Sequence, residues 1–263
     1  MLLLVLAALG GAGGAGASYL FTPMFKADAV LIPSEELLGL NEIGGLGSLG
    51  GLASLVGLGK NGNKENEAIE TLKSRALLRA YIEVNGLLPI IFHDRWDSSA
   101  KKWKVDSQGR VPTLEDGFKK FDDRILNVVE NHKTGLISIS VTWEDPALAK
   151  KWVDGLIDAA NDRLRTRAVD RSTRTLEYLE KISTSISAME VKATIYKLIE
   201  SEIKKQMIIA GGKDYAFRVV DPPVLPERKV SPRRALFLVL GALILPSIYS
   251  LIIVLRGHKG VPR

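Results

Sequence analysis

Cysteine is absent from this 263-residue chain, and histidine occurs only three times. Without cysteine there are no disulfides and no thiolate metal sites, although this neither requires nor excludes an oxidising compartment. His93, His132 and His258 are scattered, and none stands at metal-ligand spacing from another. Asp94 and Asp97 lie near His93, where a solvated loop is a better explanation than a metal cluster. We therefore expect no bound metal.

Sequence patterns that carry catalysis or nucleotide binding are also missing. The glycine-rich segment 39–59 ends in Gly59-Lys60, but Asn61 follows the lysine and Ser54 stands at the first glycine position, so the phosphate-binding loop pattern fails. No strand-to-helix elbow supports a Ser/His/Asp group. We expect a protein that is not an enzyme and that needs no cofactor.

Charge is missing from two long segments, one at each end of the chain. Ala235–Leu255 contains 21 residues without a charge, which as a helix would span about 30 Å, the thickness of a hydrocarbon core. Residues 1–25 are also uncharged, and Gly10 and Gly14 have the spacing that lets membrane helices approach closely. We interpret both segments as transmembrane helices. The alternatives are a cleaved signal peptide for the first, which lacks a basic n-region, and a buried core helix for the second.

The residues between these segments carry most of the charge, and the chain has a formal net charge of +6. The basic excess gathers near the second segment, which favours membrane lipids over nucleic acid as a partner. A proline-rich basic collar precedes that segment, and we predict that it is a stiff stalk at the membrane interface. The collar residues are Pro222, Pro223, Pro226, Pro232, Arg233 and Arg234.

Hydrophobic periodicity predicts an α+β domain between the two spans. Alternating residues predict strands, of which 135–143 is the clearest, and a Thr113/Asp116 capping box predicts a helix start. The glycine-rich segment is predicted to be a loop or weak helix packed on protein or membrane. The predicted elements are strands at 26–33, 135–143 and 215–220, helices at 64–84 and 113–129, and a polar loop at 93–112.

A long helical arm is predicted from Pro146 to Ala210, which contains one glycine and no further proline. Asp145 can cap its start, and a helix of this length would extend about 95 Å. Ser183–Ser187 is a point where the helix can bend. The arm carries an apolar stripe at spacings of three and four, which is either the inner face of a helical domain or the contact with a second protomer. The predicted interface residues are Leu176, Leu179, Ile186, Met189, Tyr196, Ile199 and Ile203.

Several segments, in this order and with a span at each end, resemble the polysaccharide co-polymerases, the Wzz-type chain-length determinants of bacterial envelope glycan synthesis. The resemblance covers nearly all of the chain, although no single motif decides it. The segments are 19–23, 27–33, 66–75, Trp96-Asp97, 112–116, 135–146 and 220–226.

The resemblance implies a two-pass protein of the bacterial inner membrane with both termini in the cytoplasm. The implied fold class is an α+β membrane protein in which two transmembrane helices flank a periplasmic domain, with a membrane-proximal α/β base and a long extended α-helix. The implied domains are 1–25 first span, 26–145 base, 146–212 arm, 213–234 last strand and stalk, 235–255 second span and 256–263 cytoplasmic tail.

The function implied by the resemblance is control of polysaccharide chain length, whether of O-antigen, capsule or exopolysaccharide. The implied partners are further copies in a ring, an octamer being one candidate, a Wzy-type polymerase and the lipid-linked polysaccharide. The family has no catalytic residues to carry over. The sequence departs from it in having no cytoplasmic lead before the first span and no kinase domain after Leu255. The competing hypothesis is a membrane adaptor that activates a separate cytoplasmic tyrosine kinase in exopolysaccharide export.

Overall fold

The computed structural model describes residues 10–13, 16, 21–34, 62–212, 214–232, 238–239, 241–243 and 247. The predicted loop 39–59 and tail 256–263 lie outside these residues, as do most of both predicted spans. The chain divides into two compact units, one of Met1–Lys26, Thr142–Ala149 and Leu225–Arg263, the other of Ala27–Val141 and Lys150–Val224.

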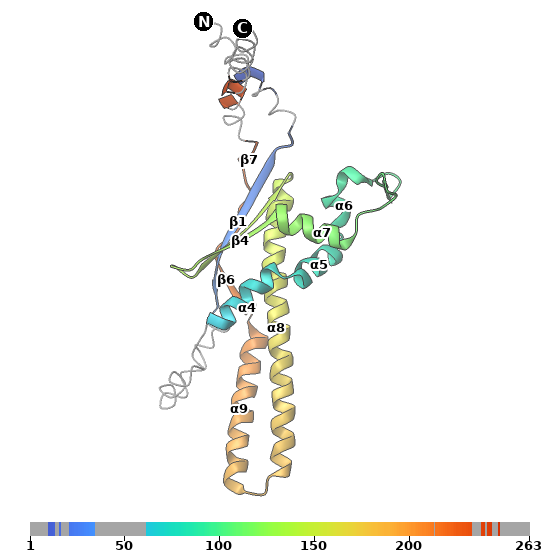
Figure 1. Ribbon diagram of the computed structural model, residues 1–263. Helices are drawn as coiled ribbons and strands as arrows, with labels where there is room; N and C mark the ends of the chain where they lie inside the picture. The colour runs from blue at the N-terminus through green and yellow to red at the C-terminus, as the bar shows by residue number, and fades with distance from the viewer. Residues whose placement is uncertain are drawn as a thin grey trace, which may run out of the picture. The chain divides into compact units, whose positions relative to one another are not determined.

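The main sheet has the strand order β4-β5-β1-β6, and β7 pairs with β1 off this path (Figure 1). β4 and β5 form an antiparallel hairpin that runs from the pair Leu126↔Val141 to the pair Asn131↔Leu136, and β6 lies antiparallel to β1. The predicted strands at 26–33, 135–143 and 215–220 are therefore confirmed with small shifts. The strands are β1 (Met24–Pro33), β4 (Leu126–Asn131), β5 (Leu136–Trp143), β6 (Phe217–Asp221) and β7 (Lys229–Ser231).

The remaining elements are mostly helical. In chain order they are α4 (Gly62–Lys73), α5 (Arg75–Val84), α6 (Leu88–Ile91), η3 (His93–Arg95), β2 (Trp96–Asp97), β3 (Lys102–Trp103), α7 (Leu114–Lys120), the π-helical turn η4 (Phe121–Ile125), α8 (Pro146–Ser185) and α9 (Met189–Gly211).

Three sequence predictions are wrong in detail. The helix predicted over 64–84 breaks at Ser74, whose extended backbone and side chain cap a new helix by accepting a bond from the Leu77 N–H at 3.2 Å. The helix predicted from Thr113 to Val129 ends at Ile125, because the chain then extends into β4, where Val128 is buried and Val129 exposed. The loop predicted at 93–112 contains the short hairpin β2–β3.

The predicted single long helix is a hairpin of two helices, α8 and α9, which lie side by side (Figure 1). Residues 186–188 separate them, at the predicted bend. The hydroxyls of Ser183, Thr184 and Ser185 donate to carbonyls three residues back at 2.7–2.9 Å, a local bond that competes with helix continuation. The amide of Gln206 donates to the Thr173 hydroxyl at 3.0 Å across the hairpin. α8 and α9 thus pack against each other within one chain.

The start of α8 is capped as predicted. The Asp145 carboxylate accepts bonds from the Ala147 N–H at 2.7 Å and the Leu148 N–H at 3.3 Å, and Pro146 takes the first helical position. These bonds satisfy N–H groups that a helix start leaves without an intrahelical partner.

The first half of α8 carries a core-facing stripe that includes Trp152, Leu156 and Leu164. Trp152 packs against Phe121, with ring centroids 5.6 Å apart. Asn161 lies in the same stripe and is only 3% exposed. Its Oδ1 accepts bonds from the N–H groups of Ala216 (2.9 Å) and Phe217 (2.8 Å), and its Nδ2 donates to the Phe217 carbonyl at 3.0 Å. One buried amide thus joins α8 to the start of β6.

Close packing between α5 and α8 depends on Gly155. The Tyr81 ring lies directly over this glycine, and a Cβ there would overlap the phenol oxygen and approach two ring carbons to 3.1 Å. Burial of the phenol, with the nearby carboxylates of Asp158 and Asp154, raises the pKa of Tyr81 to about 12. The single glycine of α8 is therefore a contact site.

In the smaller unit, β7 pairs with the first residues of β1 through Met24↔Ser231 and Phe25↔Lys229. Gly11, in a helical segment, lies against residues far along the chain: a Cβ on it would stand 3.5 Å from the Leu238 carbonyl oxygen and 3.6 Å from the Ala242 Cβ. The two uncharged segments thus touch where they are described. Within those ranges no helix meets the length and hydropathy that a membrane crossing requires.

Removing the Asn161 amide should destabilise the protein strongly. Asn161→Ala leaves two N–H groups and one carbonyl without their partner, at about 1–3 kcal/mol each where water cannot replace the bond, so we expect a loss of about 3 kcal/mol or more. Urea unfolding of the full chain in a neutral detergent, followed by circular dichroism at 222 nm, measures this. Thr166→Ala, an exposed change on the same helix, is the control and should stay within about 0.5 kcal/mol. Equal stability of the two variants would contradict the role given to Asn161.

Candidate functional site: the helical arm and the tryptophan hairpin

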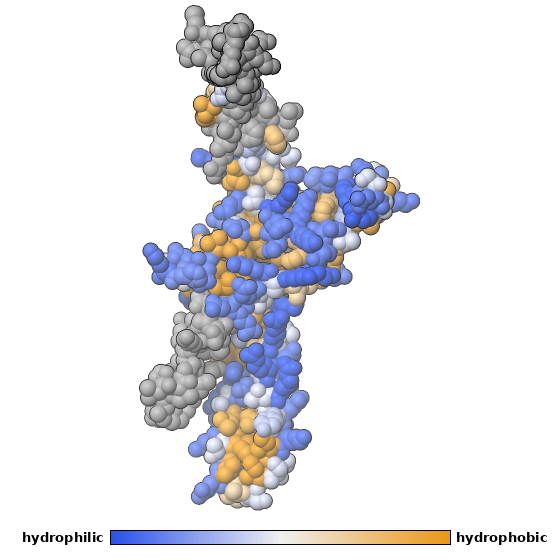
Figure 2. All heavy atoms as spheres, viewed as in Figure 1, coloured by the Kyte–Doolittle hydropathy of each residue, from blue (hydrophilic) through white to orange (hydrophobic). Residues whose placement is uncertain are grey.

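The α8–α9 hairpin leaves many of its apolar side chains exposed to solvent. Ile195 and Ile209 of α9 are buried, but other large apolar residues of the same helix are open to solvent, Met189 being 80% exposed. Figure 2 shows apolar residues gathered at the end of the hairpin where α8 and α9 are joined. The exposed large hydrophobic residues of α9 are Met189, Val191, Tyr196, Leu198, Ile203, Met207 and Ile208. A patch of this kind is typical of a surface that binds another protein or a membrane.

The predicted interface residues fall into two groups. Leu176, Leu179, Ile186 and Ile199 are half-buried in the single chain. Met189, Tyr196 and Ile203 are exposed, so they are free to contact a second molecule. The structure therefore divides the predicted stripe, because folding of the arm into a hairpin covers part of it. Whether the exposed group binds a second protomer stays a prediction.

Charged residues border the exposed face of α9. Lys204 donates to Glu200 at 2.6 Å, and Lys205 lies 3.8 Å from Glu202. The hydrogen bond from Lys204 and its charge lower the pKa of Glu200. Apolar residues bordered by polar ones form the common pattern of a protein interface.

The prolines of the collar differ in solvent exposure, whereas a stalk that stands free of the fold would expose all of them. Pro223 and Pro232 are buried, Pro226 is half-buried and Pro222 is exposed. The collar also contains the short strand β7, which the sequence did not indicate. Arg233 and Arg234 lie outside the described residues, as does Gly14. Gly10 is buried in a helical turn, but the measured close approach is at Gly11.

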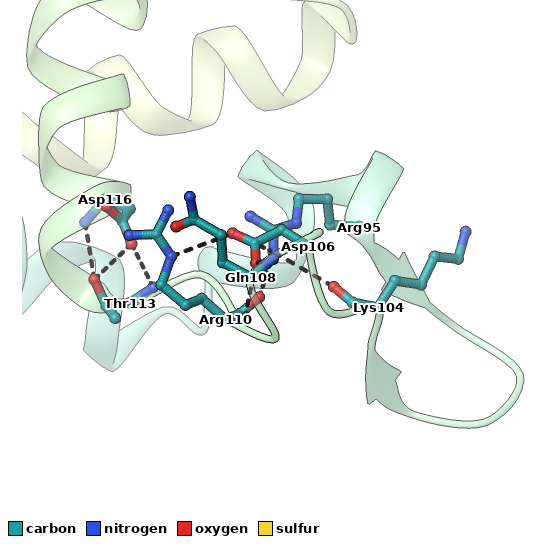
Figure 3. Close-up of polar contacts among 7 residues, drawn as sticks. All are labelled: Arg95, Lys104, Asp106, Gln108, Arg110, Thr113 and Asp116. Atoms are coloured by element: carbon teal, nitrogen blue, oxygen red, sulfur yellow. Dashed lines mark hydrogen bonds and ion pairs between the residues drawn. The ribbon is translucent and has the colours of Figure 1, made fainter.

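A second surface is the loop between η3 and α7, which Asp106 organises (Figure 3). Its Oδ1 accepts bonds from the N–H groups of Gln108 and Arg110, both at 2.8 Å. The Arg110 guanidinium lies 3.4 Å from its other oxygen. The guanidinium of Arg95 donates to the Arg110 carbonyl at 2.6 Å, which closes the loop. These backbone bonds, that from Arg110 foremost, lower the pKa of Asp106.

The β2–β3 hairpin presents two tryptophans at the base of this loop. Trp96 and Trp103 are cross-strand partners, with ring centroids 4.8 Å apart and ring planes at 62°. Both rings are half-buried. The turn between the strands is held by Asp97, which accepts bonds from the N–H groups of Ser99 (2.9 Å) and Ala100 (3.0 Å). Aromatic and cationic side chains thus lie on an ordered support, the kind of surface that can contact a sugar or a polar protein.

The part of the chain that the structure describes contains no group of three or more His, Cys, Asp or Glu residues arranged to hold a metal. Two organising residues, Asn161 and Asp106, were missed by sequence reasoning. A signal existed for both: Asn161 interrupts an apolar stripe, and Asp106 stands three residues before Gly109, as in a tight turn whose last residue has a positive φ, here 74°.

No family model and no curated protein matches the chain. Among solved structures it is similar to a full-length bacterial polysaccharide co-polymerase, at 13% identity and a TM-score of 0.38, over 98% of this chain and 94% of that one. It is also similar to a fragment of WzzB, a polysaccharide co-polymerase of Salmonella Typhimurium, at 15% identity and a TM-score of 0.36, over 80% and 100% of the two chains. A third is a mutant of the Shigella flexneri O-antigen chain-length regulator WzzB, at 10% identity and a TM-score of 0.26, over 78% and 99%. These structural neighbours belong to the family that the sequence resembles.

Charge placed on the exposed face of α9 should weaken self-association without unfolding the arm. Met189→Glu with Ile203→Glu introduces two carboxylates at exposed positions, so the helix should keep its stability while an apolar contact between copies loses area. Native mass spectrometry of the detergent-solubilised full chain reports the distribution of assemblies, which should shift to smaller species. Lys197→Glu on the same helix is the control. An unchanged distribution would remove this face from the interface.

Loss of the Asp106 carboxylate should loosen its loop. In Asp106→Ala, the N–H groups of Gln108 and Arg110 lose their acceptor, so trypsin should cleave after Arg110 markedly faster than in the native chain. Asp122→Ala, at another exposed aspartate, should leave cleavage unchanged.

Since the pKa of Asp106 is lowered by folding, the stabilisation of the loop by its carboxylate is present above about pH 4 and is lost as pH falls further. Hydrogen exchange of residues 107–111, corrected for intrinsic rates, should therefore rise below pH 4 in the native chain only.

Proposed function

We propose that this protein is a membrane-anchored, self-assembling scaffold that regulates polysaccharide chain length. One observation carries the proposal: a helical hairpin with an exposed apolar face stands on an α/β base. This is a surface for assembly. The exposed apolar residues of α9 form this surface. The sequence resemblance to Wzz-type determinants supplies the biological role.

The two-pass arrangement is supported by the smaller unit. β1 begins at Met24, in the last residues of the first uncharged segment, β7 ends at Ser231, shortly before the second, and the two strands are paired. The two uncharged segments also lie close together, since Gly11 approaches Leu238 and Ala242. Segments that leave the fold side by side would enter one face of a bilayer together, so both ends of the chain would lie on the same side. We infer the bacterial inner membrane, with the base and arm in the periplasm.

The partners follow from the same proposal. Copies of the chain associate through the exposed residues of α9 into a ring-like homo-oligomer. The base and the tryptophan hairpin then face a Wzy-type polymerase and its lipid-linked polysaccharide. In this arrangement the protein acts by holding the polymerase and the growing glycan together for a limited time. It does not change a covalent bond itself.

Deletion of the gene should change the length distribution of one envelope glycan. Gel electrophoresis of the extracted O-antigen, capsule and exopolysaccharide shows this as loss of a modal length, which the native gene should restore and the Met189→Glu/Ile203→Glu variant should not. Lys197→Glu is the matched control and should restore the native distribution. An unchanged distribution after deletion, together with lost phosphorylation of a tyrosine kinase, would replace this proposal with the adaptor hypothesis.

A further inference from the structure

A cavity of about 350 Å³ lies where α8, α9 and the segment before β6 meet. α8 lines one side, and its polar lining residues include Arg167, Arg171 and Ser172. α9 contributes Glu202 and Lys205, and Glu67 and Tyr215 complete the polar lining. None of its lining residues is one of the exposed apolar residues of α9 or part of the tryptophan hairpin.

Two guanidinium groups line this cavity and pair with no carboxylate among the described residues. Arg167 and Arg171 are four residues apart on α8, so they lie on one helical face. Throughout the described ranges neither side chain forms an ion pair, whereas the cation opposite, Lys205, lies 3.8 Å from Glu202. Glu202 is thus engaged with lysine, and among the described residues the other lining carboxylate, Glu67, forms no ion pair with either arginine. Both guanidinium groups therefore keep donors for a ligand.

A buried hydroxyl at the same place also lacks a partner. Ser172 is 1% exposed, and its Oγ makes no hydrogen bond in the described structure. Hydroxyls in helices usually bond to a preceding carbonyl, as Thr175 does with Arg171 at 3.0 Å. A buried donor left without an acceptor destabilises the folded protein. A ligand in the cavity could supply the acceptor that the Ser172 hydroxyl lacks.

The chemistry of these donors selects an oxyanion. A guanidinium presents planar pairs of N–H groups that match a carboxylate or a phosphate, and a hydroxyl adds a further donor. The half-buried Tyr215 and the apolar Leu164 and Ala168 line the same cavity, which therefore also has room and surface for a sugar ring. We propose that the cavity binds an anionic sugar residue, a uronate or a sugar phosphate, whose charged group bonds to Arg167, Arg171 and Ser172. The choice of a sugar rests on the proposed function, while the choice of an oxyanion rests on the donors alone.

Binding should be measured by isothermal titration calorimetry on the full chain in a neutral detergent. Glucuronate and glucose 1-phosphate should bind, and their affinity should fall with added salt because the contact is ionic. Glucose should not bind, and inorganic phosphate and glycerol 3-phosphate should bind more weakly than the two anionic sugars. If inorganic phosphate or glycerol 3-phosphate bound as tightly as the two anionic sugars, the cavity would be a simple oxyanion or lipid-headgroup site, and the sugar assignment would be overturned.

Variants separate the site from general charge. Arg167→Gln and Arg171→Gln should each weaken binding about tenfold or more, since each removes a charged donor pair. The double change Arg174→Gln/Lys181→Gln removes two charges from exposed positions of the same helix outside the cavity and should not alter the affinity. Ser172→Ala should weaken binding several-fold yet leave the unfolding midpoint unchanged or higher, because Oγ has no partner in the protein. A lowered midpoint with unaltered affinity would overturn the assignment of Ser172.

The two proposals fail separately. If the anionic sugars do not bind but gene deletion still changes glycan length, the site is wrong and the proposed function stands. If deletion leaves the glycan unchanged while the sugars bind and the arginine variants do not, the proposed function is wrong and the site stands.

Discussion

The bond set of Asn161 is the constraint on which the larger unit depends. α8 is long and continuous, and β6 follows the entire helical hairpin, so the end of the hairpin must return to one place on α8. A single buried amide satisfies three backbone groups at that place, with distances of 2.8–3.0 Å. Because polar groups buried without partners are unfavourable, only one register of the returning chain satisfies all three. The position of α9 beside α8 follows from it.

That register also places the arginine cavity. Arg167, Arg171 and Ser172 lie on α8 within about three turns after Asn161, and Tyr215 lies two residues before the strand that Asn161 holds. The guanidinium of Arg165 donates to the Gly212 carbonyl at 3.1 Å, which adds a second tie between α8 and the returning chain. The same bonds that hold the fold thus bring residues some fifty positions apart into one wall of a cavity.

The sequence predicted the elements whose signal is local, and it failed where the signal is distant. The alternation of Ile137, Ile139 and Val141, the Thr113/Asp116 box and the Asp145-Pro146 start are each contained in a few residues, and the structure confirms all three. The hairpin of the arm was missed as such, because an apolar stripe looks the same whether it meets another chain or its own neighbour. β4 and β7 were missed because their pairing partners, not their own composition, make them strands. The bond from Arg95 to the Arg110 carbonyl joins residues whose proximity only the folded loop creates.

The pairing of β1 with β7 has a mechanical consequence. The two strands are antiparallel, and the chain leaves both of them, at Met24 and Ser231, from the same end of the ladder. A force that pulled the two uncharged segments apart would therefore break the hydrogen bonds between β1 and β7 one pair after another, starting at Met24 and Ser231. Only a small force is needed to break bonds in sequence, and the strands can pair again in the same register. The ladder therefore sets the register of the chain next to the two terminal segments, and the close approach of Gly11 to Leu238 and Ala242 is a second contact between them.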